Sequence, residues 1–142
     1  MIIDTTYLLP LSAVGVDTDL LKAIDDGRIN LELSKLAISS ISLFELQAKT
    51  AKLGVSTNLT NEAIDVITSM FRVEPFYDKE VVDIGFELLK HIPDYIDCII
   101  AATAIAVGEG LITEDTKIID KKHFLRERYK LNIASYKELI KR

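Results

Sequence analysis

The chain has 142 residues, of which 49% are hydrophobic and 27% charged, and this globular composition excludes disorder, a collagen-like repeat and a disulfide scaffold. The length predicts a single domain over residues 1–142, and one cysteine cannot form an internal disulfide. The net charge of −5 argues against simple non-specific coating of nucleic acid.

We expect neither a membrane span nor a secretion signal. The longest apolar run, 98–107, has ten residues, whereas a helical span needs about 20. Residues 1–4 carry no basic leader ahead of their apolar stretch, unlike a secretory signal. The sequence therefore predicts a cytoplasmic protein.

Positive charge is concentrated towards the C-terminus. Residues 117–142 hold nine Lys/Arg and three Asp/Glu, whereas residues 1–116 hold eight and nineteen. Such an asymmetry is typical of a basic docking surface beside an acidic centre, or simply of a solvated C-terminal helix. Charge alone favours the solvated helix.

Short strands alternate with helices along the chain. In chain order, the pattern predicts a strand at Met1–Asp4, a helical stretch broken near Pro10–Gly15, a helix at Asp17–Gly27 with Asp17 as N-cap, a strand at Leu36–Ser40, and helices at Ser42–Gly54 and Thr60–Phe71. It then predicts a strand at Arg72–Tyr77, helices at Asp78–Pro93 and Asp94–Gly108, a strand at Gly110–Thr113, a mixed charged segment, a short strand at Leu131–Ala134 and a helix from Ser135. Strands separated by helices indicate an α/β sandwich with a mainly parallel sheet.

Four acidic residues lie where such a sheet would place a site. Asp4 ends the first strand and Asp115 follows the fourth, while Glu45 and Asp97 lie one turn into the helices that begin at Ser42 and Asp94. Parallel sheets bind ligands at the carboxyl ends of their strands. Carboxylates that converge there repel one another unless they hold a divalent cation, and oxygen ligands alone suit Mg²⁺ or Mn²⁺ rather than zinc.

Each of these acids also has a purely structural interpretation. Asp4 and Asp115 can be helix N-caps. Residues 42–45 fit a capping box in which Glu45 reaches back to a backbone N–H, and residues 94–97 fit the same box. The joint pattern favours a site, because a fold rarely needs four acids at one end of its sheet for stability.

Three stretches of the chain resemble the PIN domain family. They are MIIDTT at residues 1–6, DCIIAATA at 97–104 and LITED at 111–115, which are similar to the family's opening strand, central acidic helix and late strand with its acidic turn. Glu45 falls where the family places its glutamate. The resemblance covers nearly the whole chain, and the most similar subgroup is the VapC-type toxins of toxin–antitoxin pairs. It implies a Rossmann-like three-layer α/β/α sandwich and a ribonuclease that depends on Mg²⁺ or Mn²⁺.

The resemblance also implies roles for individual residues. Asp4, Glu45, Asp97 and Asp115 carry over as catalytic metal ligands, and Thr5 and Thr113 as hydroxyls that support the metal site or contact the substrate. The implied partners are an RNA substrate, a small antitoxin protein and a second copy of the chain, with no membrane.

One position departs from the family pattern. Lys117 stands two places after Asp115, where many members have a second acid or Asn. Asp120 could replace that residue only if the loop were longer. The departure concerns a second metal ion more than the first.

An acidic cluster repels RNA, so phosphate contacts must come from basic side chains. The candidates in the basic C-terminal segment are Lys121, Lys122, Arg126 and Arg128. Lys49 and Lys52, on the helix of Glu45, are weaker candidates.

The residues leave other functions open. A PIN-like scaffold with a weak site, acting in protein or RNA binding, is the main alternative. Retention of all four acids argues against it, while Lys117 leaves it open. A haloacid dehalogenase-type phosphatase would need a second Asp at position 6, where the chain has Thr. No Gly-rich turn follows the first strand, which argues against dinucleotide binding. Four aromatic residues are predicted to lie in the core: Tyr7, Phe44, Phe76 and Phe86.

Overall fold

The computed structural model describes residues 1–140. It contains one five-stranded sheet in the order β3-β2-β1-β4-β5, and every neighbouring pair of strands is parallel. The strands are β1 (Ile2–Ile3), β2 (Ala37–Ser39), β3 (Arg72–Glu74), β4 (Leu111–Ile112) and β5 (Ile133–Ala134). The parallel sheet predicted from alternating strands and helices is confirmed.

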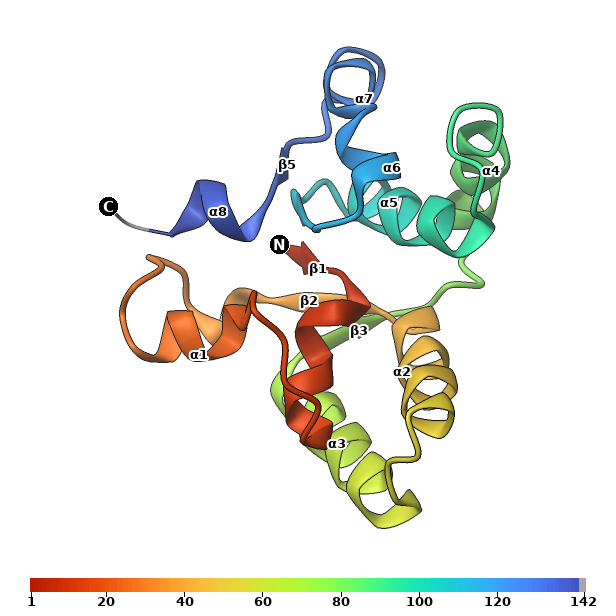
Figure 1. The fold of residues 1–142 in the computed structure, drawn as a ribbon. Helices are drawn as coiled ribbons and strands as arrows, with labels where there is room; N and C mark the ends of the chain where they lie inside the picture. The colour runs from red at the N-terminus through yellow and green to blue at the C-terminus, as the bar shows by residue number, and fades with distance from the viewer. Residues whose placement is uncertain (141–142) are drawn as a thin grey trace.

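Helices cover both faces of this sheet (Figure 1). One face carries α4 (Lys79–Leu88), α5 (Tyr95–Val107), α6 (Thr116–Ile119) and α7 (Lys122–Tyr129). The other carries the 3-10 helix η1 (Thr5–Ser12) with α1 (Leu20–Asp25), α2 (Ile41–Lys52) and α3 (Thr57–Met70). A short turn, η2 (Leu33–Lys35), precedes β2, and α8 (Tyr136–Leu139) follows β5. The three-layer α/β/α sandwich is thereby confirmed.

Consecutive residues of each central strand pack into two separate hydrophobic cores. Ile2 packs with the α5 side and Ile3 with the η1 side, and both are fully buried. Leu111 and Ile112 of β4 divide in the same way. Because side chains alternate across a strand, strands covered on both faces must be apolar throughout.

The most apolar segment of the chain is α5, which lies between the sheet and α4 (Figure 1). All of its residues from Asp97 to Ala104 are buried. A Cβ added at Gly85 of α4 would come within 2.9 Å of the Ile99 side chain, so the two helices approach closely. Within residues 1–140, no helix is long and apolar enough to cross a membrane.

Several element boundaries differ from the prediction. Helix α1 begins at Leu20, and its N-cap is Asp19, which accepts a bond from the Lys22 amide at 3.1 Å, rather than Asp17. Helix α3 begins at Thr57, where the Ser56 side chain caps it. In both cases the side chain closest to the first helical turn does the capping.

The predicted third strand is too long, and the mixed charged segment after β4 is helical. Strand β3 ends at Glu74, because Pro75 cannot donate to the ladder. Residues 116–129 form α6 and α7, which bury Ile118 and Leu125 between charged side chains. The last predicted helix is confirmed at α8, and residues 141–142 of that prediction lie outside the described part of the chain.

Only one of the four predicted core aromatic residues is buried. Tyr7 is fully buried, whereas Phe44, Phe76 and Phe86 expose 61%, 42% and 66% of their surface. Helix register explains the error for Phe44, since α2 buries positions 42, 46 and 50 and position 44 lies about 200° around the helix from position 42.

Candidate active site

A cavity of about 300 Å³ opens at the carboxyl ends of the strands. Its lining residues are Asp4, Thr6, Glu45, Lys49, Asp94, Asp97, Glu114, Asp115 and Lys117. This acidic pocket includes all four acids singled out in the sequence. They come from the end of β1, from α2, from the first turn of α5 and from the loop after β4.

Two threonine hydroxyls hold three of the four acids. Thr113 donates from its Oγ1 to Asp4 Oδ2 at 2.6 Å, and the same hydroxyl accepts the Asp115 amide at 3.0 Å. Thr5 donates from its Oγ1 to Glu45 Oε1 at 2.5 Å. Both threonines are fully buried, so their hydroxyls orient carboxylates beneath the pocket surface.

The structural interpretations hold for two of the acids and fail for one. Asp4 and Asp115 do cap η1 and α6, accepting the amides of Thr5 and Lys117 at 2.7 and 2.9 Å. The capping box at residues 42–45 is wrong, because α2 begins at Ile41 and the carboxylate of Glu45 binds the Thr5 hydroxyl instead. Asp4 and Asp115 therefore cap helices while they line the pocket.

Asp94 and Asp97 have different roles at the start of α5. Asp94 Oδ1 accepts the amides of Ile96 and Asp97 at 2.9 and 3.2 Å, which caps the helix. Among the described residues, no hydrogen bond joins the Asp97 carboxylate back to the Asp94 amide. The Asp97 carboxylate is thus left to the pocket, although the residue is only 8% exposed.

The surroundings of Asp4 and Asp97 disfavour the ionised form of both carboxyl groups. Burial, followed by the neighbouring carboxylates of Asp115, Asp94 and Asp4, raises the pKa of Asp97 to about 8. Burial also raises the pKa of Asp4, with the Glu45 carboxylate adding to the effect, although bonds from Thr113 and Thr5 act in the opposite direction. Protons or a cation are therefore needed to offset the crowded carboxylates.

The basic candidates divide into two groups. Lys49 and Lys117 line the pocket, whereas Lys52 does not. None of the four C-terminal candidates lines it: Lys122 pairs with Glu138 at 2.8 Å, Arg128 lies over the Tyr129 ring at 5.1 Å, and Lys121 and Arg126 are exposed. Positive charge at the pocket itself thus comes from α2 and α6.

The donor chemistry of the pocket fits a hard divalent cation, since its four predicted ligands all offer carboxylate oxygens. Their present arrangement is not a finished coordination shell, because no group of three or more His, Cys, Asp or Glu side chains within residues 1–140 is disposed to hold a metal ion. The carboxylates of Asp4 and Glu45 face threonine hydroxyls. Ligation would require these side chains to turn towards the centre of the pocket.

The family model described as PIN domain matches residues 1–124 of the chain. The chain belongs to the PIN domain family. No curated protein matches it in sequence.

Solved structures share the fold of this PIN domain. One is FitAcB from Neisseria gonorrhoeae, with 21% identity, a TM-score of 0.68 and coverage of 97% of this chain and 99% of that chain. Another is VapBC2 from Rickettsia felis bound to a promoter DNA fragment, with 23% identity, a TM-score of 0.63 and coverage of 94% and 96%. VapBC-1 from nontypeable Haemophilus influenzae has 19% identity, a TM-score of 0.64 and coverage of 96% and 97%.

Glu114 also lines the pocket of this PIN domain, although the sequence pattern does not predict a role for it. The buried Tyr7 hydroxyl and the Tyr136 amide, the latter at 2.7 Å, both donate to Glu114 Oε2. The loop that carries Asp115 is therefore clamped from η1 and from the start of α8. In the sequence, the only signal for a role of Glu114 is its position next to Asp115, since its partner Tyr7 is 107 positions away.

Tyr7→Phe should lower the free energy of unfolding by about 1–3 kcal/mol, because it removes a buried hydrogen bond to a carboxylate while keeping the ring. Urea denaturation of the metal-free protein measures this change. Tyr129→Phe is the matched control, since its hydroxyl bonds to Glu87 at the surface, and it should cost less. Equal effects in the two variants would contradict the clamp.

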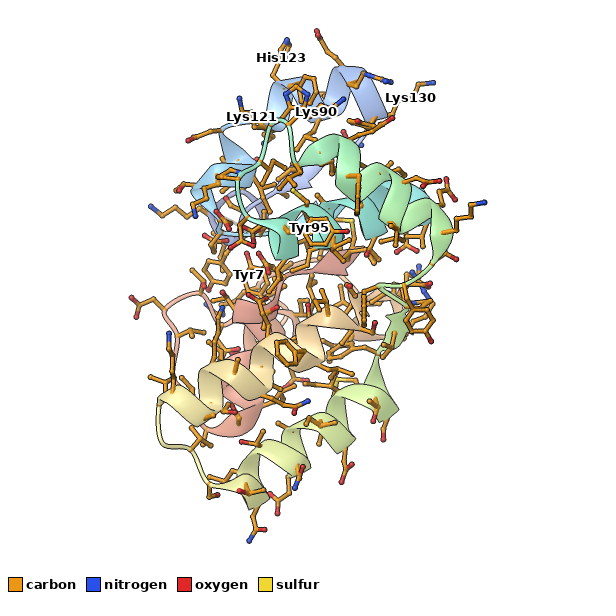
Figure 2. All side chains as sticks on the ribbon, turned by 90° about the vertical axis from the view of Figure 1, so that its right-hand side faces the viewer. Tyr7, Lys90, Tyr95, Lys121, His123 and Lys130 are labelled. Atoms are coloured by element: carbon orange, nitrogen blue, oxygen red, sulfur yellow. The ribbon has the colours of Figure 1, made fainter. Side chains whose placement is uncertain are left out.

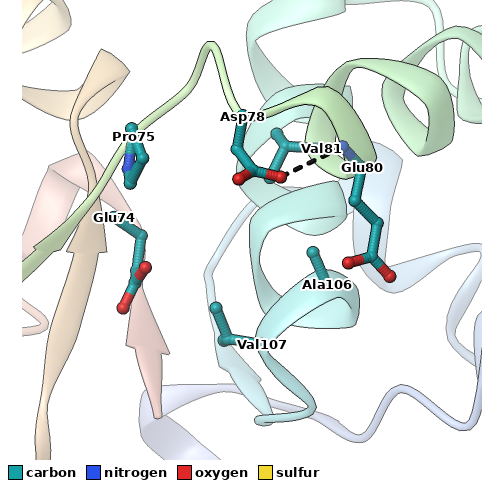
Figure 3. Close-up of a pocket in the computed structure, with 7 residues that line it drawn as sticks. All are labelled: Glu74, Pro75, Asp78, Glu80, Val81, Ala106 and Val107. Atoms are coloured by element: carbon teal, nitrogen blue, oxygen red, sulfur yellow. Dashed lines mark hydrogen bonds between the residues drawn. The ribbon is translucent and has the colours of Figure 1, made fainter.

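A second acidic hollow, lined by Glu74, Asp78 and Glu80, lies between the start of α4 and the end of α5 (Figure 3). Two of its acids have local partners: Asp78 caps α4 by accepting the Glu80 amide at 3.0 Å, and Glu74 accepts from Arg72 at 2.6 Å. The hollow encloses about 120 Å³. It is smaller than the acidic pocket and offers a control surface for experiments on it.

Proposed function

We propose that this PIN domain is a divalent-metal-dependent endoribonuclease and the toxin of a toxin–antitoxin pair. The observation that carries the proposal is the acidic pocket, which acidic residues from four separate segments line although burial and mutual repulsion raise the pKa of two of them. Such a costly arrangement is typical of a functional site. Membership of the PIN domain family supports the same activity.

The ligands of the cation would be Asp4, Glu45, Asp97 and Asp115. Bound Mg²⁺ or Mn²⁺ supplies the acidity that makes water a nucleophile near neutral pH, together with positive charge for the phosphodiester transition state. In this structure the hydroxyls of Thr113 and Thr5 bond to Asp4 and Glu45, and these two carboxylates would turn from them towards the cation. Lys49 and Lys117 are the two basic residues that line the pocket, where they would contact the phosphate next to the scissile bond.

The antitoxin partner is supported by two structural neighbours, one described as a toxin–antitoxin complex from Klebsiella pneumoniae and one as a member of the VapBC family of toxin–antitoxin systems from Mycobacterium tuberculosis. The homodimer and the cytoplasmic location are implied by the resemblance and the sequence pattern. Mass measurement of the purified chain, alone and mixed with the product of the neighbouring reading frame, tests both assemblies. A chain that stays monomeric in both samples would contradict them.

Cleavage of RNA tests the activity directly. The purified chain, incubated with an RNA pool, should cut it when Mg²⁺ or Mn²⁺ is present and should stop when EDTA is added. Cleavage that continues in EDTA would contradict a role for metal. Intact RNA under every metal condition would contradict the nuclease.

The second candidate is a scaffold with a weak or inactive site. It is favoured by Lys117, whose ammonium lines the pocket, and by the unfinished coordination shell among the described residues. Calorimetry separates the two functions, since a nuclease should bind Mg²⁺ or Mn²⁺ with an affinity in the millimolar range or tighter. Lack of binding at millimolar metal would favour the scaffold.

A further inference from the structure

The acidic pocket cannot attract RNA by itself. Six of its lining residues are acidic and two are lysines. An RNA strand carries one negative charge per nucleotide, so its binding energy must come largely from basic side chains elsewhere. Binding energy from such remote contacts can hold the reacting bond in place.

A concentration of unpaired positive charge lies at the end of the molecule formed by α7 and the α4–α5 connection. We call it the basic end, and its residues are Lys90, Lys121, Arg126, Arg128 and Lys130, all of them exposed. Among the residues that the structure describes, none of these five side chains forms an ion pair. Figure 2 shows Lys90, Lys121 and Lys130 at this end, and Tyr7 near the middle of the molecule.

Contacts between the two segments fix the shape of the basic end. The His91 ring packs on Phe124 with ring centroids 4.3 Å apart, and the Tyr129 hydroxyl donates to Glu87 at 2.9 Å. Lys90 is therefore held beside α7, although about thirty residues separate them along the chain. Aromatic rings among basic side chains are what single-stranded nucleic acid uses for stacking.

The basic end is continuous with the pocket through α6. Lys117 lines the pocket, and Lys121 follows four residues later on a helical turn closed by the Asp120 and Lys121 amides, at 2.8 and 3.0 Å from their acceptors. The rise between Lys117 and Lys121 is about 6 Å. Along one strand of a helical nucleic acid, that distance spans about two phosphates.

We infer that the basic end is an RNA-binding surface that holds the strand flanking the bond placed in the acidic pocket. The inference rests on the proposed nuclease and adds the class of substrate: an RNA long enough to run from the pocket past Lys117 and Lys121 to α7. Recognition of the phosphate backbone there sets affinity, while the pocket carries the chemistry.

Binding in EDTA tests the surface without requiring cleavage. A labelled RNA of about 20 nucleotides is titrated with the parent and with Lys90→Ala/Lys121→Ala/Arg126→Ala. The triple variant should bind at least about tenfold more weakly, and the slope of log affinity against log salt should fall by about two, because three phosphate contacts are lost.

The matched control is Lys22→Ala/Lys35→Ala/Lys79→Ala, which removes three exposed positive charges from other parts of the molecule. It should change the affinity less than about threefold. Equal losses in the two triple variants would reduce the effect to net charge and overturn the inference. A DNA strand of the same sequence that binds the basic end more tightly than RNA would also overturn it.

Cleavage then relates the surface to the site. For the long RNA, the basic-end variant should raise KM at least about tenfold and leave kcat nearly unchanged, whereas cleavage of a tetranucleotide should be unaffected. Equal losses on both substrates would overturn the inference. If the parent cuts neither RNA, the proposed nuclease fails, and the binding measurement still decides the basic end.

Discussion

Asp97→Asn and Asp4→Asn should each lower Mg²⁺-dependent cleavage of RNA by at least about 10²–10³-fold while the protein stays folded. Both substitutions keep the size of the side chain and remove a carboxylate from the acidic pocket. Each should also weaken Mn²⁺ binding in a calorimetric titration. Thermal unfolding in EDTA checks that the fold is retained.

Glu80→Gln provides the matched control. It removes one negative charge from the second acidic hollow (Figure 3), which is separate from the acidic pocket. Cleavage by this variant should equal that of the parent. If Asp97→Asn and Asp4→Asn also cut as fast as the parent in the same preparation, the assignment of the site is wrong.

The location of the pocket could be predicted because topology determines it. Asp4 and Asp115 follow two strands that are neighbours in the sheet, and the carboxyl ends of parallel strands meet at one edge. Asp97 lies in the first turn of α5 and Glu45 is the fifth residue of α2, and both helices begin near that edge. Sequence order and the parallel sheet therefore suffice to bring the four segments together.

Side-chain partners could not be predicted in the same way. The bond from Tyr7 to Glu114 joins residues 107 positions apart, and the bond from Thr5 to Glu45 decides against a local capping box that the sequence fits equally well. Local patterns cannot choose between a partner three residues away and one across the fold. That choice depends on packing between η1, α2 and the loop after β4.

Helix register and short helices account for the remaining errors. Phe86 is 66% exposed because α4 buries positions 81, 85 and 88, and position 86 lies about 100° around the helix from position 85. Helix α7 has eight residues and buries only Leu125, so its apolar periodicity is too weak to be read from the sequence. The sequence shows the positive charge of the basic end, but it does not show that Lys90 lies beside α7.

Without metal, the protein should lose stability as the pH rises from about 4 to about 8, and Asp97→Asn should remove the part of that loss that Asp97 contributes. Burial and the neighbouring carboxylates raise the pKa of Asp97 to about 8 in the folded chain, whereas an unfolded Asp titrates near 3.9. Between these values the folded chain keeps a proton that the unfolded chain has released, so a rise in pH favours unfolding. The stability linked to this group is complete below about pH 4 and is lost as the pH passes through about 8.

Urea denaturation in EDTA between about pH 5 and pH 8 measures the effect as the variant's free energy of unfolding minus that of the parent. This difference should grow with pH to a few kcal/mol and level off above about pH 8. Asp83→Asn, at an exposed carboxylate of α4, is the matched control, and its difference at about pH 8 should be smaller than that of Asp97→Asn. Mn²⁺ added at the upper end of the range should stabilise the parent more than Asp97→Asn, because a cation relieves the same repulsion. A difference for Asp97→Asn that is constant in pH would contradict the crowding of carboxylates, which is the physical reason for the pocket to attract a cation.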